Sequence, residues 1–175
     1  DDNAFEVRLN SNISGDITNS GTITAGGDAF EVFTNSTISG AITNSGTITA
    51  TDNAFVVRAS TISGAITNEV GGIITAGFDA FVVAFGSTIS GAITNRGTIT
   101  ATDGEFADGN AFNVVNTSDI SGAITNEVGG IITADDNAFV VRLNSNISGA
   151  ITNSGTITAG GDAFHLDDKS IISGD

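Results

Sequence analysis

Apolar and hydroxyl-bearing residues alternate along most of this chain. Across residues 36–50, STISGAITNSGTITA, the isoleucines Ile38, Ile42 and Ile48 share one parity, whereas Thr43 and Thr47 lie on the other. Successive side chains of an extended chain point to opposite faces. The alternation therefore predicts strands with isoleucine inside and threonine outside, and no segment has the periodicity of a helix.

The pattern recurs in units that begin with Ala-Phe-x-Val or a close variant. The phenylalanines of this motif are Phe5, Phe30, Phe55, Phe81, Phe112, Phe139 and Phe164. Each unit continues with Ile-x-Gly-x-Ile and then Ile-x-Ala, which predicts three short strands per unit. A repeat of 25–31 residues indicates a solenoid, and we expect about seven coils.

Small and polar residues mark the corners between these strands. One corner has an asparagine in every complete unit, namely Asn19, Asn44, Asn68, Asn95, Asn126 and Asn153. Asn, Asp and Gly tolerate left-handed backbone angles, which suits tight turns. Extra residues fall only at corners, at 69–72, 102–110 and 127–130, so the strands keep their length.

The apolar side chains of one coil are too few to offset the entropy lost on ordering its backbone. Stacked coils would pair their strands about 4.8 Å apart and place phenylalanine over phenylalanine and asparagine over asparagine. We therefore predict an all-β fold, a parallel β-helix (β-solenoid) that spans residues 1–175 as a single segment.

Charge and composition narrow the range of partners. The net charge is −15 with five basic residues, and the chain has no Cys, Pro, Met, Trp or Tyr. Such acidity disfavours nucleic acid and anionic membrane surfaces, and no apolar run is long enough to span a bilayer. We expect no nucleic-acid partner and no membrane insertion of this segment, and the absence of Cys excludes disulfides and thiolate metal sites.

The units ISGAITNSGTITA and GGDAF resemble the repeats in the passenger regions of bacterial autotransporters and related large surface proteins. The resemblance covers the whole chain and implies an extracellular or cell-surface location. Such passengers include adhesins, biofilm proteins, filaments and some enzymes. A coil of about 25 residues also resembles the right-handed parallel β-helix, so we expect that hand; strict hexapeptide repeats, typical of left-handed helices, are absent.

The leading functional hypothesis is structural: a rigid β-solenoid of a surface adhesin, matrix fibre or filament. The chain begins and stops inside repeats, so we expect part of a longer repetitive chain or a fibre-forming subunit. Its partners would then be further coils of the same chain, or other copies stacked end to end, with a host or matrix surface as an additional partner.

We do not expect an enzyme or an organic cofactor. A polysaccharide-degrading enzyme on a solenoid would need acidic residues and a basic residue gathered on one face. The only histidine, His165, lies in an outward slot near the end, and Arg8, Arg58 and Arg142 share a slot that other residues fill in the remaining coils. A solvated face explains these residues better, and this enzyme is the third hypothesis.

One extended corner is a candidate calcium site. Asp103, Glu105 and Asp108 crowd a turn in which Gly104 and Gly109 allow the chain to curl. Calcium takes several oxygen ligands from such loops. The spacing matches neither an EF-hand nor the glycine-rich calcium repeat, so a soluble loop is the favoured interpretation.

The second functional hypothesis is a ligand-binding solenoid that uses a threonine face. Outward Thr-x-Thr pairs recur at Thr22, Thr24, Thr47, Thr49, Thr98, Thr100, Thr156 and Thr158. Stacked, they would resemble the faces of solenoid antifreeze proteins, so ice or a glycan is the candidate ligand. Ile73 and Ile131 interrupt one file, and threonine also favours strands by intrinsic propensity.

Overall fold

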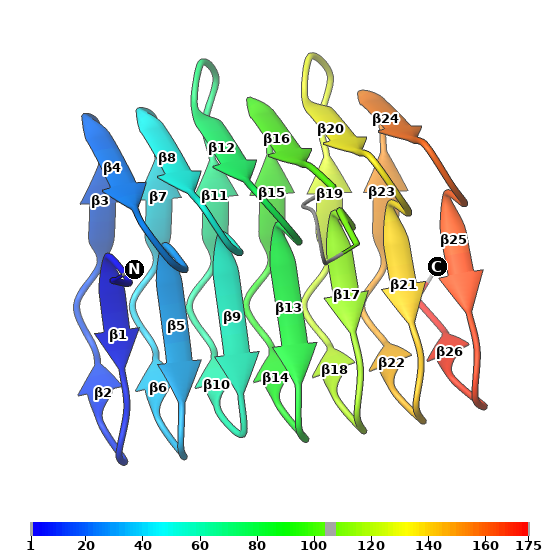
Figure 1. Ribbon diagram of the computed structural model, residues 1–175, viewed down its shortest axis with the longest axis horizontal. Helices are drawn as coiled ribbons and strands as arrows, with labels where there is room; N and C mark the ends of the chain where they lie inside the picture. Colours follow the sequence, from blue (N-terminus) through cyan, green and yellow to red (C-terminus); the bar gives the residue numbers. More distant parts are fainter. Residues whose placement is uncertain (1, 104–107, 175) are drawn as a thin grey trace.

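The structure, a computed structural model, describes residues 2–103 and 108–174. Within these ranges the chain forms 26 β-strands and no helix. Every pairing is parallel and joins a strand to its counterpart one coil away. Figure 1 shows the coils following one another from the N-terminal to the C-terminal end, along the longest axis. The predicted parallel β-solenoid of about seven turns is confirmed.

The strands form four parallel sheets, which we name the phenylalanine, threonine, short and asparagine sheets. The phenylalanine sheet contains β1 (Phe5–Val7), β5 (Phe30–Phe33), β9 (Phe55–Arg58), β13 (Phe81–Ala84), β17 (Phe112–Val114), β21 (Phe139–Val141) and β25 (Phe164–Leu166). The threonine sheet contains β4 (Thr22–Ala25), β8 (Thr47–Ala50), β12 (Ile73–Ala76), β16 (Thr98–Ala101), β20 (Ile131–Ala134) and β24 (Thr156–Ala159).

The other two sheets lie behind these in Figure 1. The short sheet contains β2 (Asn12–Ile13), β6 (Thr37–Ile38), β10 (Thr61–Ile62), β14 (Thr88–Ile89), β18 (Asp119–Ile120), β22 (Asn146–Ile147) and β26 (Ile171–Ile172). The asparagine sheet contains β3 (Ile17–Asn19), β7 (Ile42–Asn44), β11 (Ile66–Asn68), β15 (Ile93–Asn95), β19 (Ile124–Asn126) and β23 (Ile151–Asn153).

The second of the three predicted strands is divided in two, so a complete coil has four strands. The break between β6 and β7 falls at Gly40, which lies two residues after Ile38 and two before Ile42. The amides of Ser39 and Gly40 both donate to the carbonyl of Ile13, at 2.8 and 3.4 Å. Two donors on one acceptor interrupt the regular ladder. A Cβ at Gly40 would collide with the carbonyl of Gly15 on the preceding coil, so the backbones approach there more closely than any side chain allows.

Like residues stack through the interior, as the alternation predicts. Six consecutive pairs of phenylalanine rings have centroids 4.7–5.0 Å apart and planes within 8° of parallel. This spacing is the distance between neighbouring strands, so the backbone sets it. The five inner rings, from Phe30 to Phe139, are at most 1% exposed. The stacked isoleucines, such as Ile38, Ile62 and Ile89, complete the core.

The turn between the phenylalanine and short sheets has an unusual backbone. Most coils place two consecutive residues there in the left-handed region, for example Thr34 and Asn35 at φ 58° and 57°. Residues other than glycine rarely adopt these angles. Hydrogen bonds between the turns of adjacent coils stabilise this backbone. For example, the amide of Asn35 donates to the carbonyl of Ala59, one coil away, at 2.8 Å.

Within residues 2–103 and 108–174, the first and last strands of each sheet have a neighbour on one side only. Phe5 at one end is partly exposed, and Phe164 at the other is 50% exposed. The phenylalanine and short sheets have seven strands, whereas the other two have six. The last coil of the described chain thus contributes only β25 and β26.

Candidate functional site

The threonine sheet presents its outward side chains in two straight files. The first file is interrupted, because Ile73 pairs with Thr47 and Thr98, and Ile131 takes the same place two coils further on. The second file is unbroken and consists of Thr24, Thr49, Thr75, Thr100, Thr133 and Thr158. The structure therefore brings together all the threonines proposed from the sequence and adds Thr75 and Thr133.

The two coils that interrupt the threonine file also carry the longest corners of this type. Val70 and Val128, at the tips of the Glu-Val-Gly-Gly corners, are 79% and 84% exposed. Figure 1 shows these corners as two loops that extend beyond their neighbours at the edge of the threonine sheet, between β11 and β12 and between β19 and β20. A flat ligand would thus meet a face with two ridges at one border.

An arginine joins these two long corners across the coil between them. Arg96 Nη2 lies 2.8 Å from Glu127 Oε1, and Arg96 Nη1 lies 3.3 Å from Glu69 Oε2. The hydrogen bond from Arg96 lowers the pKa of Glu127 below its ordinary value. These groups are partly solvated, so the two ion pairs contribute little to the stability of the fold.

The asparagine corner forms a side-chain amide ladder over the six coils that contain it. Each Nδ2 donates to the Oδ1 of the next asparagine at 2.8–2.9 Å, from Asn19 to Asn153. The same amide groups also reach backbone carbonyls, as from Asn44 to Gly46 at 3.1 Å. Because the four inner asparagines are at most 2% exposed, this ladder satisfies polar groups that would otherwise be buried without partners.

A second ladder, which the sequence reasoning missed, runs through serines, and its five inner members are buried. Each serine amide donates to the hydroxyl oxygen of the serine on the next coil at 3.1–3.2 Å. The members are Ser11, Ser36, Ser60, Ser87, Ser118, Ser145 and Ser170. The signal was present, since each serine precedes the first isoleucine of its unit by two residues and so shares its inward parity.

A third ladder mixes Asn and Asp at the corner before each phenylalanine. The carboxylate Oδ1 of Asp79 accepts hydrogen bonds from the amide N–H and from Nδ2 of Asn110, both at 2.9 Å. Its Oδ2 accepts from Asn113 Nδ2 at 2.7 Å. Burial raises the pKa of Asp79, and these hydrogen bonds oppose the rise. No two aspartates are neighbours in this ladder, so a carboxylate always has an amide donor one coil further on wherever a further coil follows.

The corner proposed for calcium is only partly described, and Glu105 lies outside the described residues. The amide of Asp103 donates to Asp135 Oδ2 at 3.2 Å, and Asp108 Oδ2 lies 3.8 Å from Arg142 Nη2. Within residues 2–103 and 108–174, no group of three or more acidic or histidine side chains is arranged to hold a metal ion. Calcium binding here stays an untested prediction.

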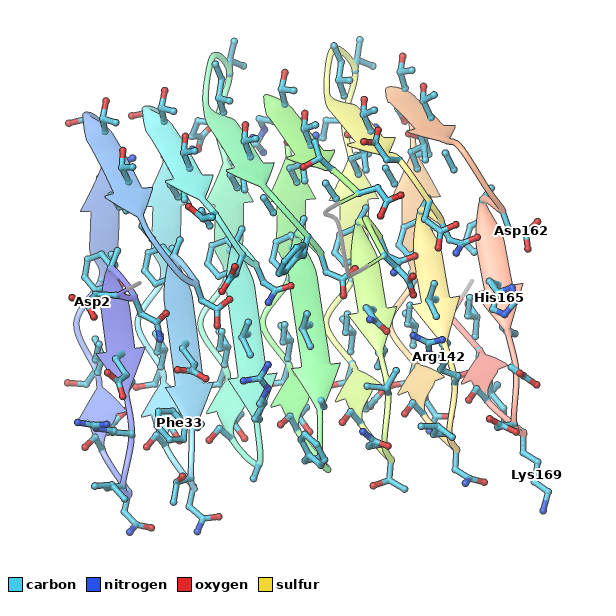
Figure 2. All side chains as sticks on the ribbon, in the orientation of Figure 1. Asp2, Phe33, Arg142, Asp162, His165 and Lys169 are labelled. Atoms are coloured by element: carbon cyan, nitrogen blue, oxygen red, sulfur yellow. The ribbon has the colours of Figure 1, made fainter. Side chains whose placement is uncertain are left out.

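The basic residues considered for catalysis lie on different coils, and each forms an ion pair or a close contact with a carboxylate. His165 Nδ1 lies 3.2 Å from Asp162 Oδ2 on the last coil, and Figure 2 shows this pair near the C-terminal end with Arg142 on the neighbouring coil. Arg8 and Arg58 pair with Glu6 and Glu31 at 2.7 and 3.0 Å. Each arginine thus lies against a carboxylate of its own.

One expectation about the outward slot between Phe and Val needs correction. The slot accepts Glu6, Asn113 and His165, which predicts solvent exposure along its whole length, yet Val56 and Val140 are 0% and 2% exposed. Side chains in a file lie one strand spacing apart, so neighbours on both sides cover at least part of each inner member. Glu31, Val82 and Asn113 are partly buried, whereas Val56 and Val140 are fully buried.

Within the described residues, no helix has the length and apolar character needed to cross a membrane. Comparison of the chain with models of protein families, with curated proteins and with solved structures gave no match. The likeness to autotransporter passengers is therefore a resemblance of repeat units, and the class that the structure itself defines is a β-solenoid of stacked coils.

Proposed function

We propose that this chain is a structural element, a rigid rod within an extracellular adhesin, matrix fibre or filament of a bacterial surface. The observation that carries the proposal is the unbroken register: every strand pairs residue for residue with its counterpart, from Phe5 on Phe30 to Phe139 on Phe164. Such repetition extends a protein in one direction without changing its cross-section.

Three buried ladders resist bending and slippage of one coil on the next. A shift of one residue would turn the inward isoleucines of a coil to solvent and its outward threonines inward. It would also separate the asparagine, serine and Asn/Asp ladders, and their buried members would lose the partners that the present register gives them. The solenoid therefore combines stiffness with a single register, which are the properties of a spacer or fibre.

The open edges support growth through further coils or another copy. Unpaired strand edges are templates for other strands, and the strands here are parallel, which suits addition of a coil with the same direction. A second copy with its β1 on β25 and its β2 on β26 would leave one rung empty in the asparagine and threonine sheets. Seamless stacking needs one Ile-Thr-Asn and one Thr-Ile-Thr-Ala strand between the copies.

Small-angle scattering and negative-stain microscopy of the purified chain test the rod. We expect a particle whose length grows with protein concentration, and faster growth when residues 150–159 are repeated after Gly174 to complete the last coil. Leu166→Lys, at the open edge, should suppress this growth, whereas Thr133→Lys, on the broad face, should not. A compact particle of constant size, or equal effects of the two lysines, would contradict the proposal.

The unbroken threonine file favours a second candidate, a solenoid that binds ice or a glycan through this face. Its hydroxyl groups repeat at the strand spacing in a straight line. Thermal hysteresis of the native chain tests binding to ice. Thr100→Glu should abolish it and Thr94→Glu, on the asparagine sheet, should leave it intact; a native chain without hysteresis would rule out the ice ligand.

A further inference from the structure

The third coil is one residue shorter than its neighbours at the turn between the phenylalanine and short sheets. The second coil has Thr34 and Asn35 in this turn and the fourth has Phe85 and Gly86, whereas the third has only Ala59. The serine ladder passes through without a break, since Ser60 bonds both neighbours. The missing residue therefore removes volume at the outside of the turn while the interior keeps its packing.

The short turn also removes one hydrogen-bond donor. In other coils the second turn residue donates its amide to the first turn residue of the next coil, as from Asn35 to Ala59 at 2.8 Å and from Gly86 to Asn116 at 2.9 Å. The amide of Ala59 instead donates to Ala84 at 3.3 Å. Within the described chain, no backbone amide donates to the carbonyl of Phe85, which is the position that the missing residue would have served.

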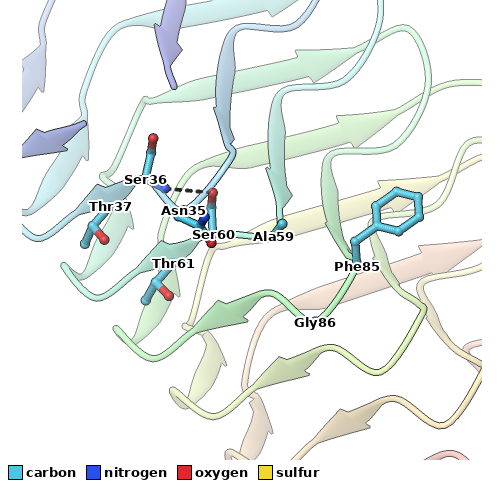
Figure 3. Close-up of a pocket in the computed structure, with 8 residues that line it drawn as sticks. All are labelled: Asn35, Ser36, Thr37, Ala59, Ser60, Thr61, Phe85 and Gly86. Atoms are coloured by element: carbon cyan, nitrogen blue, oxygen red, sulfur yellow. Dashed lines mark hydrogen bonds between the residues drawn. The ribbon is translucent and has the colours of Figure 1, made fainter. Parts of the chain in front are cut away.

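A recess of about 350 Å³ lies where this residue is missing. Its lining includes Thr37, Ser60 and Thr61, and in Figure 3 Phe85 lies across Ala59 from them. Figure 3 shows the Phe85 ring beyond Ala59, away from the serine and threonine hydroxyl groups. The Phe85 side chain belongs to a residue that is 61% exposed, so its ring is open to a ligand.

The chemistry of the lining restricts the ligand. None of the eight lining residues is charged, so a neutral molecule loses less on leaving water than an ion would. Hydroxyl groups both donate and accept, and the Phe85 carbonyl accepts only. The recess is at the small end of the volumes that hold small molecules. A ligand with several hydroxyl groups and one apolar face of C–H groups matches this combination.

We infer that the notch at Ala59 is a binding site for one neutral sugar ring of a glycan. One sugar hydroxyl donates to the Phe85 carbonyl in place of the missing amide, and the C–H face packs on the Phe85 ring, on the side of the recess away from the threonine hydroxyl groups. The site is distinct from the threonine sheet. The notch lies at the turn between β9 and β10, whereas the threonine sheet begins after the asparagine corner, at the opposite end of the coil (Figure 1). Such a site does not require that the chain act as a rod. On a rod it would be a lateral attachment point for a glycan.

The test is an NMR titration of the chain labelled with ¹⁵N, with methyl β-D-glucopyranoside as the probe. We expect saturable shifts of the amides of Ala59, Phe85 and Gly86 with a dissociation constant on the order of 1–10 mM. Phe85→Ala should weaken binding about tenfold through loss of the ring contact. Glycerol at equal concentration serves as the control for nonspecific solvent effects.

A matched variant fills the notch without removing any group. Insertion of Asn between Ala59 and Ser60 restores the two-residue turn of the second coil and supplies the amide that Phe85 lacks. This variant should fold with unchanged dispersion elsewhere and lose the sugar-dependent shifts. Shifts that survive the insertion, shifts equal with glycerol, or no shifts at 100 mM probe would each overturn the inference and leave the recess a packing irregularity.

Discussion

Residues 2–30 and 136–164 have nearly the same sequence but different surroundings. They differ only at Glu6, where the later segment has Val140, and at Asp16, where it has Ala150. Phe139 is 1% exposed, and Ile147 is 0% exposed, whereas Phe5 and Ile13 are only partly buried. The first segment has a neighbour on one side, and β21 and β22 of the later segment have neighbours on both.

The comparison shows that the burial of an inward side chain depends mainly on the adjacent coils and less on the sequence of its own coil. An inward side chain lies between its copies above and below, so one open side removes about half of its contacts. The same substitution in the two segments of the 175-residue chain therefore measures what a second neighbour contributes. Three predictions compare matched positions in the two segments, and a fourth concerns a carboxylate buried between coils; they run from the largest expected effect to the smallest.

A buried charge should show the greatest difference. Ile147→Asp places a carboxylate between Ile120 and Ile172, where it has no partner, and should cost more than about 4 kcal/mol and prevent cooperative folding. Ile13→Asp lies at the edge and should cost less than half as much, because water reaches the carboxylate. Urea unfolding followed by circular dichroism measures both; equal losses would mean that the first coil is covered in solution.

Truncation of a stacked ring should have the next largest effect. Phe139→Ala removes a ring that stacks on Phe112 and Phe164, and should destabilise the chain by about 3–5 kcal/mol. Phe5→Ala removes one stacking contact only and should destabilise it by about 1–2 kcal/mol. Thermal unfolding of the two variants gives the ratio, and a Phe5 effect as large as that of Phe139 would contradict the nearest-neighbour interpretation.

The glycine at the division of the second predicted strand offers a steric comparison. A Cβ at Gly149 would collide with the carbonyl of Gly122, whereas a Cβ at Gly15 meets nothing within 4 Å. Gly149→Ala should therefore destabilise the chain by about 1–3 kcal/mol, and Gly15→Ala should be neutral in the same chemical denaturation experiment. A destabilising Gly15→Ala would show that another coil or copy rests on the first.

The smallest effect concerns pH and the buried carboxylate of Asp79. Burial raises the folded pKa of Asp79 above the unfolded value of 3.8, so the folded chain binds the proton more tightly than the unfolded chain. The free energy of unfolding should therefore rise as the pH falls from the raised pKa towards 3.8. It should decline as the pH increases from 3.8 through the raised pKa. Urea unfolding at a series of pH values between 7 and 4 measures this change in the free energy of unfolding.

Asp79→Asn is the control for this pH dependence, because other carboxylates titrate in the same range. The variant should be less sensitive to pH than the native chain. An amide at position 79 can also donate to Asn113 Oδ1, a buried atom without a hydrogen-bond partner, once the Asn113 amide group turns. A pH profile identical to that of the native chain would show that Asp79 does not contribute.

Particular residues show how far sequence reasoning reached. The parity of Ile38, Ile42 and Ile48 predicted the inside and outside of the strands, and the spacing of Ala-Phe-x-Val predicted the number of coils. The asparagine ladder also followed from repetition, because identical residues at one corner must stack if the coils do. The serine ladder was overlooked because serine is usually a surface residue, although its inward parity was legible.

Local repetition was enough to determine the fold because each coil is packed almost entirely against copies of itself. The alternation, the period and the corner residues therefore specified an all-β parallel solenoid without reference to distant parts of the chain. The positions of insertions were legible for the same reason, since only corners tolerate a change of length in a stacked fold.

Tertiary structure alone decided what depends on differences between neighbouring coils. The division at Gly40, the bridge from Arg96 to Glu69 and Glu127, the burial of Val56 and the notch at Ala59 all require two or three coils to be placed together. A sequence pattern records the residue in each slot. The distances that govern burial, ion pairing and cavities arise between slots on adjacent layers, so they become defined only when the coils stack.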